Sequence, residues 1–124
     1  SFTSTDIELQ SVEMDGSLTQ TPEFPYNWMY DGSRPQMPGF EMEITCKSLF
    51  LIFKDSGEMD VGKADVFVND VYCMTADPHK NNWLHCNAVL LFWETESRSH
   101  KVRITVTEED QNKKFTILGF GYTI

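Results

Sequence analysis

Three observations predict an all-β fold, a β-sandwich or jelly roll. Apolar and polar residues alternate over several short stretches, turn residues separate these stretches at intervals of about 8 to 12 residues, and no stretch keeps apolar residues at helical spacing. With 124 residues, the chain is long enough to bury a core of its own. We therefore expect residues 1–124 to form a single β-sandwich domain with minimal helix.

The first 38 residues are expected to hold two strands, one of them around residues 6–12. Residues 24–32 read Phe-Pro-Tyr-Asn-Trp-Met-Tyr-Asp-Gly, and four prolines lie between positions 22 and 38. Proline and glycine favour turns and loops. We therefore interpret residues 24–32 as a loop that carries Tyr26, Trp28 and Tyr30.

Alternation of apolar and polar residues from Phe40 to Cys46 predicts a strand with one buried face. Lys47 and Ser48 then predict a tight turn. Residues 49–53 read Leu-Phe-Leu-Ile-Phe, a continuous apolar run that is typical of a strand covered on both faces. We expect this strand to be central in its sheet.

Two strand pairs are expected next. Residues 64–68 and 71–74 flank Asn69-Asp70, which favours a two-residue hairpin turn. Residues 88–93 and 100–107 form the second pair, joined by a turn over 94–99. The last strand is expected over 114–124, where Gly119 and Gly121 indicate a bulge or a close approach of another backbone.

The apolar positions of these strands define the expected core. Arg103 and Thr105 are expected on the opposite face of their strand from Ile104. The residues expected to be buried are Leu51, Val66, Val68, Val89, Leu91, Val102, Ile104 and Ile117.

Composition argues against two classes of partner. The chain has 10 Lys and Arg against 19 Asp and Glu, a formal charge of −9, which repels nucleic acid and anionic lipid surfaces. No apolar run reaches the about 20 residues that span a bilayer, and the sequence opens without a charged-then-apolar leader. We expect a soluble protein that binds neither nucleic acid nor membrane.

Motifs for catalysis and metal binding are weak. The Gly-x-Ser-x-Gly motif of serine hydrolases is missing, and Asp-Gly-Ser at 15–17 and 31–33 is ordinary turn sequence. Cysteines and histidines lack the spacing of a zinc site, and His100 is expected to be a hydrogen-bonded structural residue near a strand end. We expect no catalytic residue and no cofactor. Structural calcium stays an open alternative, with Glu41, Glu43, Asp60 and Asp65 as the available acidic ligands.

Cysteine count leaves the redox state open. Cys46, Cys73 and Cys86 allow at most one internal disulfide, and an odd thiol remains. Since free cysteines are among the most buried residue types, Cys46 and Cys73 are expected to be interior thiols.

Aromatic residues in predicted loops provide the functional expectation. A sugar stacks its C–H face on an aromatic plane and directs its hydroxyls to amide, carboxylate or guanidinium groups. The planes are Tyr26, Trp28, Tyr30 and Trp83, and the polar partners are Asn27, Asp31, Arg34 and Asn82. We expect these residues to form a carbohydrate-binding site. Individual rings could instead fold back as a lid on the open end of the sandwich. If Trp28→Ala and Trp83→Ala both bound glycan as well as the wild type, the site would be the strand face that carries Phe67, Trp93 and Arg103.

A family resemblance rests on residues 62–70, 86–92 and 100–104, on Trp83, and on Lys-Lys-Phe-Thr-Ile-Leu-Gly-Phe-Gly-Tyr over 113–122. In these stretches the chain resembles a β-sandwich domain at one end of secreted SGNH/GDSL-type carbohydrate esterases of gut and rumen clostridia. The resemblance implies a non-catalytic jelly roll of the galactose-binding type. It also implies an extracellular protein whose catalytic domain, in the same polypeptide, deacylates plant polysaccharides.

Two functions are consistent with these observations. The first is a carbohydrate-binding module that holds plant cell-wall polysaccharide near the attached catalytic domain. The alternative is a structural accessory domain that packs on the esterase and binds no ligand alone. An exposed aromatic patch would favour the first function, and a broad aliphatic patch would favour the second.

Overall fold

A computed structural model describes residues 2–5, 27–30, 39–79 and 86–124, which we refer to as the described residues. Its strands are β1 (Phe2–Thr5), β2 (Asn27–Tyr30), β3 (Phe40–Lys54), β4 (Ala64–Val68), β5 (Val71–Ala76), β6 (Cys86–Val106) and β7 (Phe115–Thr123). They form one antiparallel seven-stranded sheet in the order β1-β2-β7-β3-β6-β4-β5. The predicted all-β class is confirmed.

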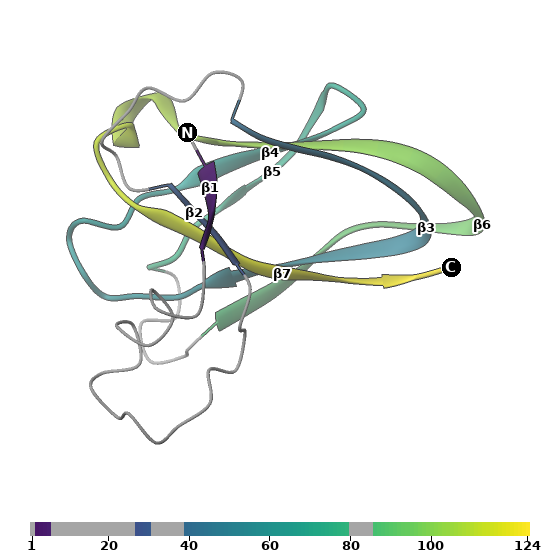
Figure 1. Ribbon diagram of the computed structural model, residues 1–124, viewed down its shortest axis with the longest axis horizontal. Coiled ribbons are helices and arrows are strands. Elements are labelled where there is room, and N and C mark those ends of the chain that lie inside the picture. The colour runs from purple at the N-terminus through teal and green to yellow at the C-terminus, as the bar shows by residue number, and fades with distance from the viewer. Residues whose placement is uncertain (1, 6–26, 31–38, 80–85) are drawn as a thin grey trace.

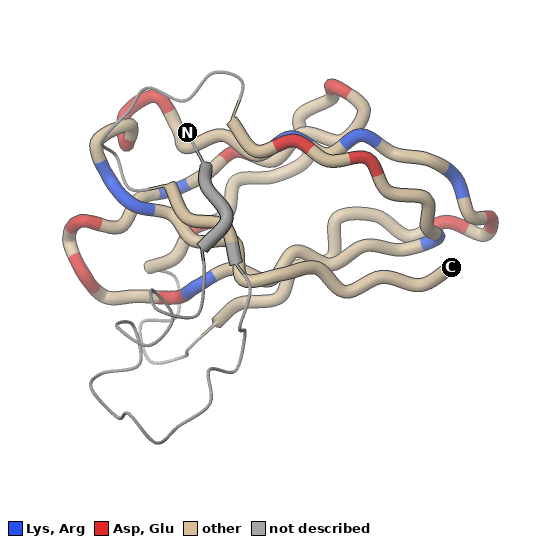
Figure 2. The backbone as a smooth tube through the Cα atoms, in the orientation of Figure 1, with Lys and Arg blue, Asp and Glu red and all other residues tan. Residues whose placement is uncertain are grey.

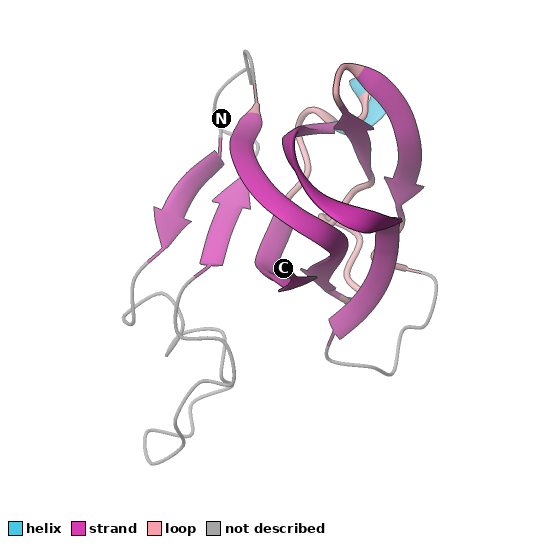
Figure 3. Cartoon of the chain, turned by 90° about the vertical axis from the view of Figure 1, so that its right-hand side faces the viewer, coloured by secondary structure: helices cyan, strands magenta, loops and turns pink. Residues whose placement is uncertain are grey.

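Helical structure in this part of the chain is limited to one short 3-10 helix, η1 (Glu108–Asp110), drawn in cyan in Figure 3. No helix among the described residues is long and apolar enough to cross a bilayer. The expectation of minimal helix therefore holds for these residues.

The sheet folds over on itself because β3 and β6, its two longest strands, bend together (Figure 1). The first half of β3 pairs with the second half of β6 in one layer, and the remaining halves pair in the other layer. β4 and β5 extend the first layer, and β7, β2 and β1 extend the second. This two-layered arrangement is consistent with the predicted β-sandwich, and the jelly-roll connectivity of the galactose-binding type stays a prediction.

An irregularity in the pairing of β3 with β6 marks the bend. Cys46 pairs with Arg98 but Ser48 pairs with Trp93, which sets Lys47 alone opposite residues 94–97. Extra residues on one strand bend a pair of strands without reversing the direction of either chain segment. The predicted turns at Lys47-Ser48 and over 94–99 are therefore wrong, because both strands continue through them. Polar residues interrupt the apolar pattern in a bulge as they do in a turn.

β3 is the central strand, as predicted, but only one of its faces is covered. Leu49, Leu51 and Phe53 are buried, whereas the side chain of Phe50 is 41% exposed. The expectation that 49–53 is covered on both faces is wrong. Six expected core residues are buried, namely Leu51, Val66, Leu91, Val102, Ile104 and Ile117, while Val68 and Val89 are half-buried.

The aromatic segment predicted as a loop contains a strand. β2 lies between β1 and β7, and Trp28 and Tyr30 pair with residues of β7. Tyr30 is fully buried and its hydroxyl donates to the carbonyl oxygen of Gln111. Trp28 is half-buried, with its ring packed against Phe40 and Phe120. Pairing with β7 thus outweighs the local turn signals. The strand expected around residues 6–12 lies outside the described residues.

Two local predictions are confirmed. Asn69 and Asp70 have φ angles of 51° and 64°, the left-handed conformation of a two-residue hairpin turn. In β7, Ile117 pairs with Phe53 but Gly119 pairs with Ile52, which leaves Leu118 as an extra residue. The bulge predicted near Gly119 is therefore present.

Truncation of the core should test the strand register. Leu51→Ala and Ile104→Ala each remove a fully buried side chain, and we expect a loss of roughly 2–5 kcal/mol in the free energy of unfolding. Urea denaturation followed by tryptophan fluorescence measures this loss. Losses below about 1 kcal/mol at both positions would contradict the register.

Gly62→Ala should destabilise the contact between the β3–β4 loop and η1. A Cβ atom at position 62 would lie 2.6 Å from the Cβ of Asp110. The Asp110 side chain is held in place because its carboxylate accepts the backbone N–H of Lys63 at 2.9 Å. We expect a loss of about 1–3 kcal/mol in urea denaturation. Gly57→Ala, where a Cβ meets nothing within 4 Å, is the matched control and should be close to neutral.

Candidate functional site

The predicted loop site is only partly visible in the structure. Tyr26, Asp31, Arg34, Asn82 and Trp83 lie outside the described residues. Asn27 is placed only by its backbone in β2, and Trp28 and Tyr30 pack into the interior. Tyr30 therefore offers no exposed ring face, and the Trp28 ring is partly packed against the core. Whether the loop residues bind sugar stays a prediction.

A different set of aromatic and polar side chains gathers on the outside of the layer that contains β4 and β5. Val66 and Ile104 are buried, and their strand neighbours therefore face outward. Phe67 pairs with Arg103 on β6 and with Tyr72 on β5. We name this set, Asp65, Phe67, Tyr72, Thr75 and Arg103, the aromatic–polar face.

Contacts between these side chains fix the exposed ring of Tyr72. The guanidinium carbon of Arg103 lies 4.2 Å from the centroid of the Phe67 ring, a cation–π contact. The Tyr72 ring meets the Phe67 ring edge-on, with centroids 6.0 Å apart. Tyr72 remains 56% exposed. The face therefore presents an aromatic plane that its neighbours hold in one orientation.

A directed hydrogen-bond chain also holds the Tyr72 ring. The Thr75 hydroxyl donates to Oδ1 of Asp65 at 2.7 Å, and Tyr72 Oη lies 2.7 Å from Thr75 Oγ1. Because the hydroxyl of Thr75 has a single proton, Tyr72 must be the donor to Thr75. The chain ends on a carboxylate, which is an acceptor. The aromatic–polar face thus combines a plane, a guanidinium donor and a carboxylate acceptor.

Sequence reasoning named Phe67 and Arg103 for the alternative site but missed Asp65, Tyr72 and Thr75. The signal for Asp65 was available, since the period of two in β4 places it on the same face as Phe67. Tyr72 and Thr75 need the register between β4 and β5, which contains an irregularity between Val66 and Phe67. Trp93 lies in the other layer, paired with Ser48, and does not share a flat surface with Phe67 and Arg103.

The other layer is poor in charged residues, although Lys54 at the end of β3 belongs to it. Residues 48–53, 86–93 and 115–124 contain no Asp, Glu, Lys or Arg, and β7 carries no coloured residue in Figure 2. Exposed large apolar side chains on β3 and β6 in this layer are Phe50 by 41%, Leu90 by 51% and Trp93 by 80%. We name these three residues the apolar patch. Its mixture of aromatic and aliphatic side chains does not by itself separate a sugar platform from a protein-docking surface.

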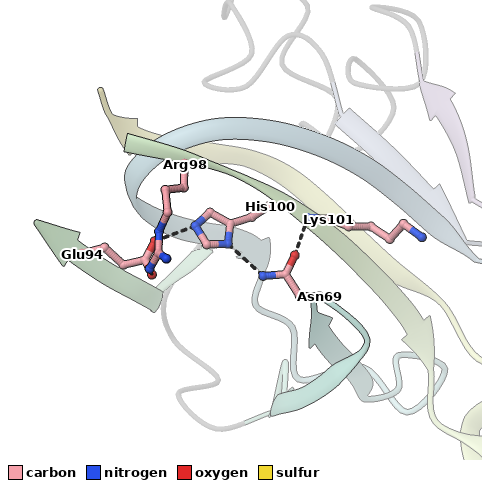
Figure 4. Close-up of polar contacts among 5 residues, drawn as sticks. All are labelled: Asn69, Glu94, Arg98, His100 and Lys101. Atoms are coloured by element: carbon pink, nitrogen blue, oxygen red, sulfur yellow. Dashed lines mark hydrogen bonds and ion pairs between the residues drawn. The ribbon is translucent and has the colours of Figure 1, made fainter. Parts of the chain in front are cut away.

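A polar network spans the bend of β6 and reaches the β4–β5 turn (Figure 4). Glu94 accepts hydrogen bonds from Arg98 and from Nε2 of His100, the latter at 2.6 Å. His100 Nδ1 lies 3.0 Å from the side-chain nitrogen of Asn69. His100 is buried, and its ring centroid is 4.2 Å from that of Phe92. His100 is therefore a hydrogen-bonded structural residue as predicted, although it lies within β6 and not near its end.

The thiols near this network are not set up as nucleophiles. Burial, and secondly the charge of Glu94, raises the pKa of the Cys46 thiol, and burial raises the pKa of Cys73. A nucleophilic cysteine needs a lowered pKa. Cys46 is interior as expected, Cys73 is half-buried, and none of Cys46, Cys73 and Cys86 is in a disulfide. The disulfide that the cysteine count allowed is not formed in this structure.

Metal ligands do not cluster in the described part of the chain, where no group of three or more His, Cys, Asp and Glu is placed to hold an ion. Asp60 pairs with Lys114 at 3.2 Å. Asp55 is buried, with Oδ1 accepting from Asn87 at 2.8 Å and Oδ2 without a hydrogen-bond partner. A single carboxylate is far from the about six to eight oxygens that calcium takes.

Comparison of the chain with family models, curated proteins and solved structures gave no match. The resemblance to esterase-associated domains therefore stays a prediction, and the geometry described above carries the functional argument.

Glu94→Gln should make the stability of the protein less dependent on pH. Burial alone would raise the pKa of Glu94, but hydrogen bonds from Arg98 and His100 outweigh it and lower that pKa. A carboxyl group with a lowered folded-state pKa stabilises the fold above its unfolded pKa of about 4.3 and loses this effect as pH falls through the folded value. The variant should therefore be less stable than the wild type near neutral pH, with a difference that shrinks as the carboxylate is protonated.

Urea denaturation of both proteins at neutral and at acidic pH measures this difference. Glu96→Gln, an exposed residue of the same bend, is the matched control and should follow the wild type. A constant difference between the Glu94→Gln variant and the wild type across the pH range would contradict the prediction.

Proposed function

We propose that this domain is a non-catalytic carbohydrate-binding module whose sugar site is the aromatic–polar face. The observation that carries the proposal is the exposed Tyr72 ring, which is linked through Phe67 to the Arg103 guanidinium and through Thr75 to the Asp65 carboxylate. A sugar ring needs an aromatic plane for its C–H groups and both donors and acceptors for its hydroxyls. All three lie within the span of three neighbouring strands, β5, β4 and β6.

The non-catalytic part of the proposal is supported by the chemistry of the chain. The sequence holds no nucleophile motif of a serine hydrolase, and the raised pKa values of Cys46 and Cys73 argue against thiolate catalysis. Following the family resemblance, we propose a plant cell-wall polysaccharide as ligand, a catalytic domain in the same polypeptide and an extracellular location. A weak site would then serve by raising the local concentration of substrate.

Tyr72→Ala should weaken polysaccharide binding by about 1–3 kcal/mol, the range of an aromatic contact at a binding site. Affinity electrophoresis in gels that contain cellulose derivative, xylan, mannan, β-glucan or pectin measures the change. Tyr122→Ala is the matched control, since Tyr122 is similarly exposed, by 57%, but lies on β7 in the other layer. Equal loss in both variants, or loss in neither, would contradict the aromatic–polar face as the site.

Trp83→Ala and Trp93→Ala extend this experiment to the other candidate surfaces. Loss of binding only in Trp83→Ala would return the site to the loops first predicted from the sequence. Loss only in Trp93→Ala would move the site to the apolar patch.

A second candidate function is a structural accessory domain that docks on the catalytic domain. The apolar patch favours it, because Phe50, Leu90 and Trp93 are exposed on a layer that is poor in charged residues. Absence of retardation by every polysaccharide in the gels above would favour this function over carbohydrate binding.

A further inference from the structure

The hydrogen bonds around His100 determine which of its ring nitrogens carries the proton. The backbone N–H of Lys101 donates to Oδ1 of Asn69 at 3.0 Å, which identifies the other atom of that amide, Nδ2, as a donor. Nδ2 lies 3.0 Å from His100 Nδ1, and Nδ1 must therefore accept. His100 is then neutral, with its proton on Nε2, where it donates to the Glu94 carboxylate (Figure 4).

Protonation of His100 would place a second donor opposite the Asn69 amide. The imidazolium carries a proton on Nδ1, and two N–H groups cannot bond to each other. If the Asn69 amide turned over to offer its oxygen, the Lys101 N–H would lose its acceptor. In either arrangement one hydrogen bond between β6 and the β4–β5 turn is lost. At Nε2, in contrast, the bond to Glu94 persists and gains charge.

The other ionisable groups near His100 do not remove this conflict. They are Arg98 and Lys101 on β6, Glu43, Cys46 and Lys47 on β3, and Asp70 in the turn. Glu94 stays ionised across the range in which histidines change charge, since its pKa is lowered, and the Cys46 thiol stays protonated, since its pKa is raised. Neither neighbour therefore offsets a change in the charge of His100.

We propose that protonation of His100 breaks its hydrogen bond to Asn69 and loosens the β4–β5 turn, so that the sugar site is ordered at neutral pH and loosened in acid. The link to sugar binding rests on the proposed function, because β4 and β5 carry Phe67 and Tyr72. The link to the turn rests on geometry alone. Asn69 joins the turn to β6 twice more, through its backbone N–H to the Lys101 carbonyl at 2.8 Å and through its side-chain oxygen.

Hydrogen exchange of the turn amides between about pH 8 and 5 tests the structural half. The protection factors of the Asn69 and Tyr72 amides, corrected for intrinsic exchange, should fall by about 2- to 10-fold in acid, as expected for one lost hydrogen bond. Val102, in the core part of β6, serves as the internal control and should keep its protection. The ¹⁵N shift of His100 Nδ1 should change from that of an acceptor to that of a protonated nitrogen over the same range.

Asn69→Asp should reverse the pH response. The new carboxylate can still accept from the Lys101 N–H, and it can also accept from a protonated Nδ1, which would strengthen the link in acid. Asn69→Gly is the matched control, because glycine keeps the positive φ of this position but has no side chain, and its turn should be weakly protected at every pH. A wild-type turn whose protection does not change with pH, or an Asn69→Asp variant that responds like the wild type, would overturn the proposal.

Affinity electrophoresis of the wild type and Asn69→Asp at both pH values tests the functional half. We expect wild-type retardation to weaken in acid and that of Asn69→Asp to be maintained. A pH-dependent turn with pH-independent sugar binding would overturn the regulation but keep the carbohydrate site. A pH-dependent turn in a protein that no polysaccharide retards would instead overturn the proposed function.

Discussion

The joint bend of β3 and β6 is the constraint on which the rest of the molecule depends. Without it, the 15 residues of β3 would extend for about 50 Å in a single layer, with neither face covered. The bend brings the two halves of one sheet face to face, and the buried residues Leu49, Leu51 and Ile104 then share one core. The extra residues of β6 at 94–97 make this possible, because a strand that pairs throughout the bend needs a longer path than its partner.

A polar network around the buried His100 ring supports this bend. Glu94 and Arg98 lie at either end of the extra segment and bond to each other, and His100 ties the segment to the hairpin turn at Asn69. Burying the His100 ring is unfavourable unless its polar atoms are bonded, which is the case for both of its nitrogens. The same requirement makes the network sensitive to protonation. The His100 imidazole lies between a hydrogen-bond donor at Nδ1 and an acceptor at Nε2, and only its neutral form with the proton on Nε2 satisfies both. Stability of the bend and order of the hairpin are thereby coupled.

The bend also separates two surfaces with different chemistry. One layer presents aromatic rings together with Arg103 and Asp65, and the other presents Phe50, Leu90 and Trp93 on segments 48–53 and 86–93, which contain no charged residue. The proposed sugar site uses the first surface, and the second candidate function uses the second surface, so that variants on each surface distinguish the two proposals.

Local sequence predicted most strand segments from Phe40 onward, the hairpin turn and much of the core, because the period of two and the positive φ of Asn69-Asp70 are properties of neighbouring residues. It did not determine the path through Lys47 and residues 94–97, since a bulge and a turn interrupt the apolar pattern alike. Nor did it determine the positions of Trp28 and Tyr30. The neighbouring turn residues predicted a loop for both, whereas pairing with β7 places them in the sheet. The candidate site followed the same division. The face of Phe67 and Arg103 was accessible from strand periodicity, but its union with Tyr72 and Thr75, and the tautomer of His100, were decided by contacts between strands that only the folded chain brings together.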